Sequence, residues 1–526
     1  MKNRSLSVFV MGVLLYAAPF LTFAQVITSQ QIDALVQRTL TTFDVPGIAV
    51  AVVKDGKVVH AKGYGVRSLK TRQPVDENTL FGIASNSKAF TAAALGMLLD
   101  EGKLTWDDKV IDHVPEFRMY DAYVTEAFTI RDLLTHRSGL GLGAGDLMFW
   151  PDSSNFTMKD IIHNLRYLKP VSGFRTKYDY DNLLYMVAGE VVERVSGKTW
   201  SEFVEERIMR PLQMNRSAGY YERLADKVNV IDAHAPVNGK VQVIDRDIMR
   251  FGYSAGGINS SVADMSKWVI AQLNRGKYGD NGDKRLFSDK VHAEMWSPQT
   301  ILPTNPTPVP PYNTHFSAYG LGWFLSDVKG LKQVTHTGGL AGMVTQVTIL
   351  PELQLGIIVF TNQQSGAAFN SVTNTIKDSY LGLPPTDWVT RYGERVKSGQ
   401  QEADKITKNI WDGIEKEQKS TTTKVDFANY AGTYRDRWFG DVVLSEQGGR
   451  TWFRSVRAPK LTGELFYYKG NTFVVKWNNR SLDADAFVTF QVDDTMKPAS
   501  IKMRPISPLT DFSFDFQDLD LQRVKQ

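Results

Sequence analysis

Residues 85–100 read SNSKAFTAAALGMLLD, and this stretch is the strongest indication of the fold. Ser85 and Lys88 form a Ser-x-x-Lys pair, and the apolar residues after it recur at the spacing of one helix face. At the start of a helix, two side chains three positions apart lie on the same face and can reach each other. A lysine partly removed from water has a lowered pKa and can accept the proton of a serine hydroxyl. The stretch therefore predicts a serine nucleophile at position 85, with Lys88 as its activating base.

A Ser-x-x-Lys pair is a weak signal by itself, because a chain of this composition contains about two by chance. The second pair here is Ser326 and Lys329. It lies between two strand-like runs and is followed by Gly330, so we expect a hairpin turn there.

Residues 252–256, GYSAG, offer a different alternative, because they match the Gly-x-Ser-x-Gly elbow of α/β-hydrolases. That elbow needs a buried strand directly before the serine and a helix directly after it. Residues 245–250 are too charged for a central strand, and the next capping box begins only at Ser261. Ser254 is therefore the weaker candidate for the nucleophile.

Two further motifs follow Ser85 in the chain. Tyr180-Asp181-Asn182 begins 95 residues later, just before a helical apolar stripe over 184–195, and residues 336–339, HTGG, end a strand-like run. In order and spacing, the three motifs resemble the serine β-lactamase and penicillin-binding-protein superfamily, and specifically its class C β-lactamase-like branch. Supporting segments lie at 128–140, 255–260 and 319–323, and the resemblance covers about residues 28–380.

The resemblance implies hydrolysis through an acyl-enzyme, in which the serine attacks a carbonyl carbon. It implies catalytic roles for Ser85, Lys88 and Tyr180, substrate binding by Asn182, His336, Thr337 and Gly338, and an oxyanion hole from the backbone N–H groups of Ser85 and Gly339. Lys88 and the phenol of Tyr180 would share the proton transfers.

One departure from the antibiotic-hydrolysing members concerns position 336, where a lysine is common and this chain has histidine. An ammonium holds a substrate carboxylate across the neutral range, whereas an imidazole with a pKa near ~6.5 is only partly charged there. Because histidine is common in the esterase and peptidase relatives, we expect peptide substrates, including D-residue or cell-wall-like ones, or small esters. A class C-like β-lactamase and a penicillin- or peptidoglycan-binding protein without turnover remain the alternatives.

The N-terminal residues 1–24 predict a cleavable signal peptide. Lys2 and Arg4 precede an apolar run from residue 6 to about 20, and a small-x-small end follows at 22–24. The run is shorter than the ~20 residues that span a bilayer comfortably, so an uncleaved anchor is the less favoured alternative. We therefore expect an exported protein, periplasmic or secreted, without stable membrane insertion after cleavage.

The amino-acid composition excludes several kinds of site and binding partner. The chain has no cysteine, which excludes disulfides, thiolate nucleophiles and thiolate metal sites. The formal charge of +4 falls to +2 without Lys2 and Arg4, which gives no electrostatic case for nucleic acid as a partner. No histidine spacing suggests a metal site, so we predict no metal, and we also predict no cofactor. We expect a small-molecule or peptide substrate. The sequence leaves the oligomeric state open.

The order of expected elements predicts an α+β fold. Strand-like runs near both ends of the first 385 residues enclose a helical middle, which indicates one antiparallel sheet built from both ends and flanked by helices. The expected strands are 48–53, 58–59, 319–324, 334–337, 344–350 and 355–361, and the helical segments are 88–100, 158–168, 182–195 and 261–273.

Past residue 385 the composition changes. A polar segment at 386–424 predicts a helix and linker, and short strand-like runs separated by turn residues predict a small all-β barrel-like domain over 425–526. Together with the signal peptide and a hydrolase domain over 25–385, this gives the expected organisation of the chain.

Overall fold

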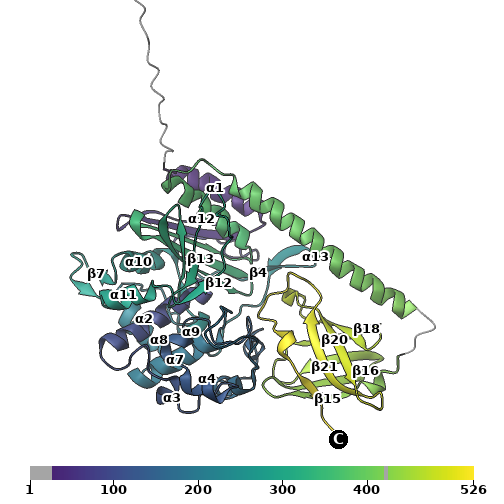
Figure 1. Cartoon of the computed structure of the whole chain (residues 1–526). Coiled ribbons are helices and arrows are strands. Elements are labelled where there is room, and N and C mark those ends of the chain that lie inside the picture. The colour runs from purple at the N-terminus through teal and green to yellow at the C-terminus, as the bar shows by residue number, and fades with distance from the viewer. Residues whose placement is uncertain (1–25, 420–424, 526) are drawn as a thin grey trace, which may run out of the picture.

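The computed structural model describes residues 26–419 and 425–525 (Figure 1). The predicted signal peptide at 1–24 and the end of the predicted linker at 420–424 lie outside the described residues. An N-terminal domain of sheet and helices is followed by the long helix α13 (Trp388–Lys419), which runs along one side of the molecule toward a closed β-barrel (Figure 1). The predicted α+β fold with an all-β C-terminal part is confirmed.

The N-terminal domain is built on an eight-stranded sheet of order β2-β1-β14-β13-β12-β11-β10-β9. β1, near the start of the chain, pairs antiparallel with β14, which is more than 300 residues away, so the sheet is built from both ends as predicted. Its strands are β1 (Gly47–Lys54), β2 (Lys57–Gly65), β9 (Thr300–Leu302), β10 (Ser317–Tyr319), β11 (Phe324–Val328), β12 (Leu331–Leu340), β13 (Met343–Leu350) and β14 (Leu355–Thr361).

Both faces of this sheet are covered, which explains why β1 and β14 read as continuous apolar runs rather than alternating ones. Alternate residues of β1 enter two different cores. Ala49, Ala51 and Val53 face the larger core, and Ile48, Val50 and Val52 face the smaller one. The helices α1 and α12 contribute to the smaller core, while α2, α7 and α10 lie in the larger.

The helical layer lies between the two groups of strands in sequence. Its central helix, α2, is buried on all sides from Ser87 to Leu98, because it packs against α7, α8, α9 and α11 and against the chain at Gly322. The helices of the N-terminal domain are α1 (Ser29–Thr42), α2 (Ser87–Asp100), α3 (Val110–His113), α4 (Ala122–Ala127), α5 (Ile130–Leu133), α6 (Met158–Asn164), α7 (Leu183–Ser196), α8 (Trp200–Val204), α9 (Tyr253–Gly256), α10 (Val262–Leu273), α11 (Asp289–Met295) and α12 (Gly366–Tyr380). Short additional pairs are β3 (Phe81–Gly82) with β6 (Asn259–Ser260), β4 (His234–Val237) with β5 (Lys240–Val243), and β7 (Lys277–Tyr278) with β8 (Lys284–Arg285).

Two local expectations were wrong. The predicted strand at 319–324 is interrupted, because Gly322 adopts φ +78° in a tight turn between β10 and β11. A Cβ at this glycine would lie 2.8 Å from the carbonyl oxygen of Lys88, so the turn packs directly on α2. Ser326 is within β11, and the hairpin turn falls at Lys329 and Gly330 instead.

The C-terminal barrel is closed and filled by its own side chains. Its strands are β15 (Gly432–Asp436), β16 (Gly440–Gln447), β17 (Arg450–Ser455), β18 (Thr462–Lys469), β19 (Thr472–Trp477), β20 (Ala486–Val492), β21 (Pro498–Pro505) and β22 (Leu521–Arg523). Aromatic residues such as Phe453, Phe473 and Trp477 pack inside it, as expected of a barrel core.

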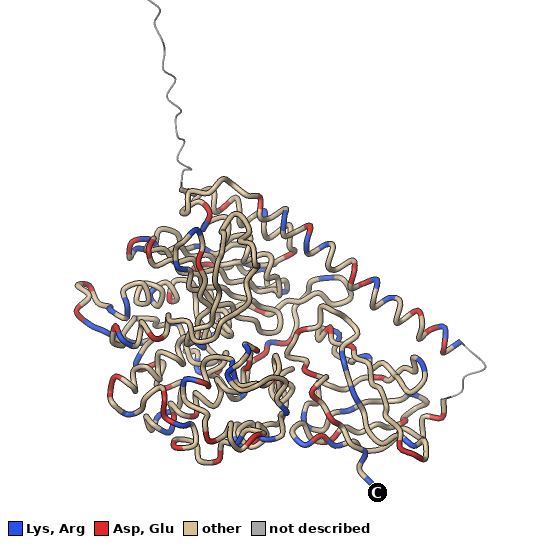
Figure 2. Tube along the Cα trace, viewed as in Figure 1, with Lys and Arg blue, Asp and Glu red and all other residues tan. Residues whose placement is uncertain are grey.

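The helix α13 connects the two parts. Near its C-terminal end, Ile410 and Ile414 pack against Val474 and Phe487 of the barrel. Its other faces carry interspersed basic and acidic residues, visible as alternating blue and red along the helix (Figure 2). Among the helices described, none combines the length and the apolar character needed to cross a membrane.

Candidate active site

Ser85 lies in a tight turn at the base of α2. The turn begins at Ala84, a buried residue with φ +49°. This left-handed conformation is uncommon for a residue with a side chain, and such strain is concentrated at functional sites. It places Ser85 on the wall of a large cavity, one helical turn before Lys88.

The Lys88 side chain is completely buried and makes three hydrogen bonds. Its Nζ lies 3.1 Å from Ser85 Oγ, 2.7 Å from Asn182 Oδ1 and 2.9 Å from the carbonyl oxygen of Ala255. Burial lowers the pKa of Lys88 to about 7, against the opposing charges of Asp146 and Asp181. The lysine therefore has a neutral form near pH 7, and the neutral amine can accept a proton from the serine.

Tyr180 lies on the loop before α7 and faces both groups. Its ring centroid is 4.8 Å from Lys88 Nζ, and it lines the cavity together with Ser85. Burial raises the pKa of Tyr180 above its ordinary value, so the phenol keeps its proton at neutral pH. Of the two predicted proton-transfer groups, only Lys88 therefore has a form near pH 7 that can accept a proton as a base. Tyr180 keeps its own proton and is suited to relaying one.

Asn182 is the N-cap residue of α7 and lines the same cavity. Its Oδ1 accepts from Lys88, while its Nδ2 donates to Asp146 Oδ2 over 2.8 Å. A carbonyl oxygen has two lone pairs, so Oδ1 retains one for a substrate N–H. The predicted contact with substrate thus remains geometrically open to Asn182.

His336 forms part of the cavity wall, but both of its ring nitrogens have partners within the protein. Nδ1 donates to the carbonyl oxygen of Thr337 at 2.6 Å, and Nε2 accepts from the Tyr319 hydroxyl at 2.9 Å. Burial, with the nearby Lys88 charge, lowers the pKa of His336 to about 3. From the sequence we expect a partly charged imidazole at neutral pH, whereas burial keeps the His336 imidazole neutral in the structure.

The two glycines after Thr337 bring β12 against the nucleophile turn. A Cβ at Gly338 would lie 2.2 Å from the carbonyl oxygen of Ile83, so only glycine allows this approach. The next residue, Gly339, is exposed and lines the cavity together with Ser85 and Thr337. The structure thus brings all the predicted site residues to one place.

The alternative serine, Ser254, lies elsewhere. It is 3% exposed, and its hydroxyl donates to the backbone carbonyl of Tyr185 at 2.8 Å. A Cβ at Gly189 would lie 2.2 Å from Ser254 Oγ, which shows how tightly α9 packs on α7. Ser254 therefore connects two helices, while its neighbour Ala255 supplies a carbonyl to Lys88.

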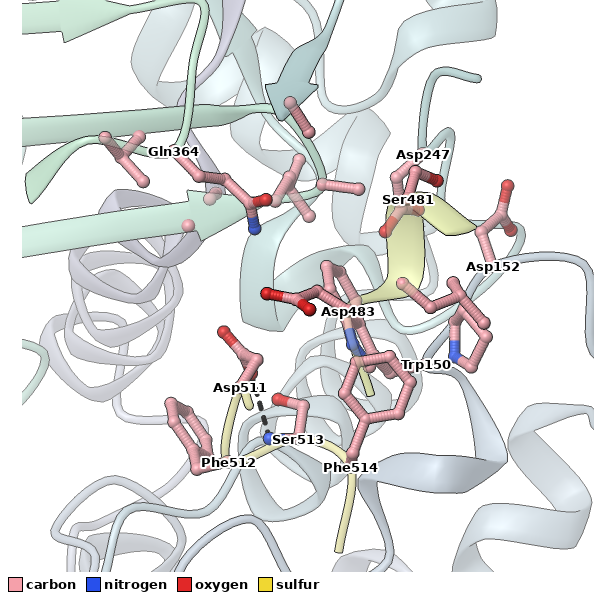
Figure 3. Close-up of a pocket in the computed structure, with 18 of the residues that line it drawn as sticks. Trp150, Asp152, Asp247, Gln364, Ser481, Asp483, Asp511, Phe512, Ser513 and Phe514 are labelled. Atoms are coloured by element: carbon pink, nitrogen blue, oxygen red, sulfur yellow. Dashed lines mark hydrogen bonds between the residues drawn. The ribbon is translucent and has the colours of Figure 1, made fainter. Parts of the chain in front are cut away.

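The cavity beside Ser85 has a volume of about 1150 Å³ and lies between the N-terminal domain and the barrel (Figure 3). Its charged lining is mainly acidic. The carboxylates are Asp152, Asp245, Asp247, Asp404, Asp483 and Asp511, and the cations among the described lining residues are Lys460 and Arg480. Arg480 is already paired with Asp485 at 2.6 Å. Burial raises the pKa of Asp247 to about 7 and also raises the pKa of Asp483 and Asp511, so part of this acidic lining is uncharged near pH 7. The lining still offers an anionic ligand few cations, which favours neutral or cationic ligands.

Several buried groups near Lys88 were not predicted from the sequence. They are Asp146, Asp181, Ser513 and Asp515, and the last two belong to the barrel. Asp146 follows the glycine-rich run at 139–145, and its position in an otherwise apolar stretch is the one local signal. Nothing in the barrel sequence marks Ser513 or Asp515, because their role depends on contacts more than 360 residues away. Across 26–419 and 425–525, no three histidine or carboxylate side chains cluster as metal ligands do.

A buried helix with a Ser-x-x-Lys pair, a facing tyrosine and a glycine-bearing strand define the serine β-lactamase and penicillin-binding-protein class of fold. Comparison with known families agrees, because the model described as Beta-lactamase matches residues 32–381; the chain belongs to this family. A second model, described as a domain of unknown function (DUF3471), matches residues 416–523.

Among characterised sequences, the unguisins hydrolase ungD' of Aspergillus campestris is 28% identical over 400 residues, which cover 71% of this chain and 70% of that protein. Protein flp of Staphylococcus aureus is 27% identical, with 64% of each chain covered. Among solved structures, the octameric penicillin-binding protein homologue from Pyrococcus abyssi is similar over 94% of this chain and 100% of its own, with a TM-score of 0.60 and 21% identity. That likeness supports the fold, and it extends into the C-terminal part.

Proposed function

We propose that this protein is a serine hydrolase that works through an acyl-enzyme on Ser85. The observation that carries the proposal is the buried Lys88 Nζ, 3.1 Å from Ser85 Oγ, with its pKa lowered to about 7. A lysine exposed to water stays charged near pH 7 and is a poor base, whereas this one has a neutral form at working pH.

In the proposed first step, Ser85 Oγ bonds to the substrate carbonyl carbon while its proton passes to Lys88. The negative oxygen that develops would be held by the backbone N–H groups of Ser85 and Gly339, and donors of this kind contribute about 2.7–4 kcal/mol each. Tyr180, a neutral phenol beside Lys88, would relay the proton from Lys88 to the leaving group as the carbonyl re-forms. Water then attacks the ester in the reverse sense and releases the acid.

We propose peptides or small esters that are neutral or cationic near the scissile bond as substrates. The neutral His336 offers no charge to a substrate carboxylate, and the surrounding cavity is acidic. Both features disfavour a β-lactam, which carries a carboxylate beside its reactive ring. The name of the fungal relative, which describes hydrolysis of unguisins, supports hydrolysis as the reaction class. The N-terminal residues 1–24 support export, either to a periplasm or out of the cell.

Intact-mass spectrometry tests the proposal directly. Wild type, Ser85→Ala and Ser254→Ala are incubated with a fluorophosphonate and, separately, with benzylpenicillin. Ser254→Ala is the matched control, because it also removes one serine hydroxyl, which bonds to the α7 backbone rather than to Lys88. We expect the fluorophosphonate adduct on wild type and Ser254→Ala, and none on Ser85→Ala.

The penicillin arm separates the alternatives. Rapid release of hydrolysed penicillin would identify a β-lactamase, and a lasting penicillin adduct without turnover of any ester would identify a binding protein. Equal fluorophosphonate labelling of wild type and Ser85→Ala, or labelling of neither, would refute Ser85 as the nucleophile.

A further inference from the structure

A loop of the barrel enters the N-terminal domain beside the nucleophile. Residues 506–520 connect β21 to β22, and Phe512 from this loop packs its ring 5.9 Å from that of Tyr180. Figure 3 shows Phe512, Ser513 and Phe514 on this loop at the edge of the cavity. Phe512 packs against the glycine-rich turn of the N-terminal domain near Gly143. A Cβ added at Gly143 would lie 2.8 Å from the Phe512 side chain.

From this loop, a continuous series of hydrogen bonds leads to the catalytic lysine. Ser513 Oγ and Asn182 Nδ2 each donate to Asp146 Oδ2 over 2.8 Å. Asn182 Oδ1 in turn accepts from Lys88 Nζ at 2.7 Å, and Nζ lies 3.1 Å from Ser85 Oγ. Ser513, Asp146, Asn182 and Lys88 are all buried, so water does not substitute freely for any of these partners.

Asp515 holds the turn that carries Asp146. Its carboxylate accepts from the backbone N–H of Gly145 at 2.6 Å and of Leu147 at 3.1 Å. These two residues flank Asp146 on either side, and Gly145 has φ +80°. The barrel therefore fixes both the side chain of Asp146, through Ser513, and its backbone, through Asp515.

Asp146 decides which way the amide of Asn182 points. A side-chain amide can be rotated by half a turn, which exchanges its oxygen and its nitrogen. In the reversed position the NH₂ group would face Lys88 Nζ, and two donors would meet. Asp146 Oδ2 accepts from both Ser513 Oγ and Asn182 Nδ2, and this contact with the amide nitrogen selects the orientation that presents Oδ1 to the lysine.

We infer that the C-terminal barrel is part of the active site, with Ser513 and Asp515 as positioning residues that act through Asp146 and Asn182 on Lys88. This inference rests on the proposed role of Lys88 as the base. It assigns a function to the barrel loop that neither the barrel fold nor its family description supplies.

Several titratable groups face Lys88, and their charges set the expected pH response. They are Asp146 and Asp181, whose charges raise the pKa of Lys88, Tyr180 and Tyr185, whose rings lie within 5.2 Å of Nζ, and the buried imidazoles of His136 and His336. Burial raises the pKa of Asp146 well above its ordinary value and the hydrogen bond from Ser513 opposes that rise, so loss of the Ser513 hydroxyl raises the pKa of Asp146 further. A less charged Asp146 then lets the pKa of Lys88 fall further.

The test measures the rate of Ser85 labelling by a fluorophosphonate as a function of pH, since this probe needs no knowledge of the natural substrate. Ser513→Ala is compared with Ser500→Ala. Ser500 is the matched control, because it is a buried barrel serine with one side-chain hydrogen bond, to Gln491, away from the cavity. Asp146→Ala and Asp146→Asn form a second pair, in which only asparagine keeps an oxygen that can accept from Asn182.

We expect Ser513→Ala and Asp146→Ala to lower the plateau rate about tenfold, the effect of one misplaced buried hydrogen bond. Ser513→Ala should also move the midpoint of the pH profile to lower pH, and Asp146→Asn should recover most of the plateau that Asp146→Ala loses. Ser500→Ala should change neither value. Thermal unfolding of each variant shows whether it is folded, and the Asp146 pair carries the test if Ser513→Ala is not.

The outcomes separate the two levels of the hypothesis. If Ser85 is labelled in wild type but Ser513→Ala and Asp146→Ala behave like Ser500→Ala, the positioning role is refuted and the serine hydrolase stands. If a lower plateau comes without a shifted midpoint and without recovery by asparagine, the loop has a structural role only. If wild type itself is not labelled on Ser85, both are refuted.

Discussion

Replacing Lys88 with methionine should abolish labelling and hydrolysis at Ser85, and it should change how the stability of the protein depends on pH. Methionine fills a similar volume but has no ionisable group, so the comparison isolates the titration of one buried amine. The stability difference between wild type and Lys88→Met should shift in favour of wild type by about 2 kcal/mol between pH 7 and pH 9.

That magnitude follows from the burial of Lys88. Its pKa is lowered to about 7 in the folded protein, whereas an unfolded lysine titrates near ~10.4. The charged amine therefore destabilises the fold fully below pH 7, and the penalty is relieved as the pH rises from 7 toward ~10.4. Removal of Lys88 also raises the pKa of Asp181, because the ammonium stabilises that carboxylate. This acts in the same direction, since the variant then loses more stability as the pH rises.

Thermal unfolding at the two pH values provides the assay. For a domain of this size, about 2 kcal/mol corresponds to a change of about 3 °C in the Tm difference. Lys377→Met is the matched comparison, because Lys377 is also buried, has its pKa lowered to about 8, and lies on α12 outside the cavity. It should show a smaller shift, of about 1 kcal/mol, and keep normal labelling of Ser85.

The result that refutes the reasoning is a Tm difference between wild type and Lys88→Met that is the same at pH 7 and pH 9. That outcome would mean that Lys88 keeps an ordinary pKa in the folded protein. Persistent labelling of Ser85 in Lys88→Met would show separately that the lysine is not the base.

Three further predictions concern the rest of the site. Gly338→Ala should reduce labelling of Ser85 by at least about tenfold, because its Cβ would lie 2.2 Å from the Ile83 carbonyl oxygen. Gly339→Ala is the comparison: the nearest neighbour of its Cβ is 3.9 Å away, so this variant should unfold at the wild-type temperature. Equal labelling of the two variants would contradict this prediction. His336→Gln should leave the midpoint of the pH–rate profile near pH 7, since burial lowers the pKa of the imidazole to about 3; a midpoint that moves with this substitution would assign the titration to the histidine. Ser254→Ala should lose about 1 kcal/mol of stability, measured by denaturation, because its hydroxyl bonds a backbone carbonyl of α7, and it should keep full labelling; a loss of labelling would reopen the elbow hypothesis.

Local patterns in the sequence were sufficient for most of the fold. The apolar runs at 48–53 and 355–361 predict strands by themselves, and the structure pairs them as neighbouring inner strands of one sheet. The turn at Gly322 was missed, because it is imposed by close packing on α2 rather than by any local turn signal strong enough to break a strand-like run. The barrel was predictable as a class, since short strands separated by turn residues have few other stable arrangements.

By itself, the sequence determined the proximity of Ser85 and Lys88, because three positions along a helix always bring two side chains to one face. Only the tertiary structure decided the chemistry of that pair. The burial that lowers the pKa of Lys88 comes from α7 and α9, which are distant in the chain. The contact between Asp146 and Ser513 spans 367 residues. Burial and long-range hydrogen bonds depend on how whole elements pack, and no local pattern carries that information.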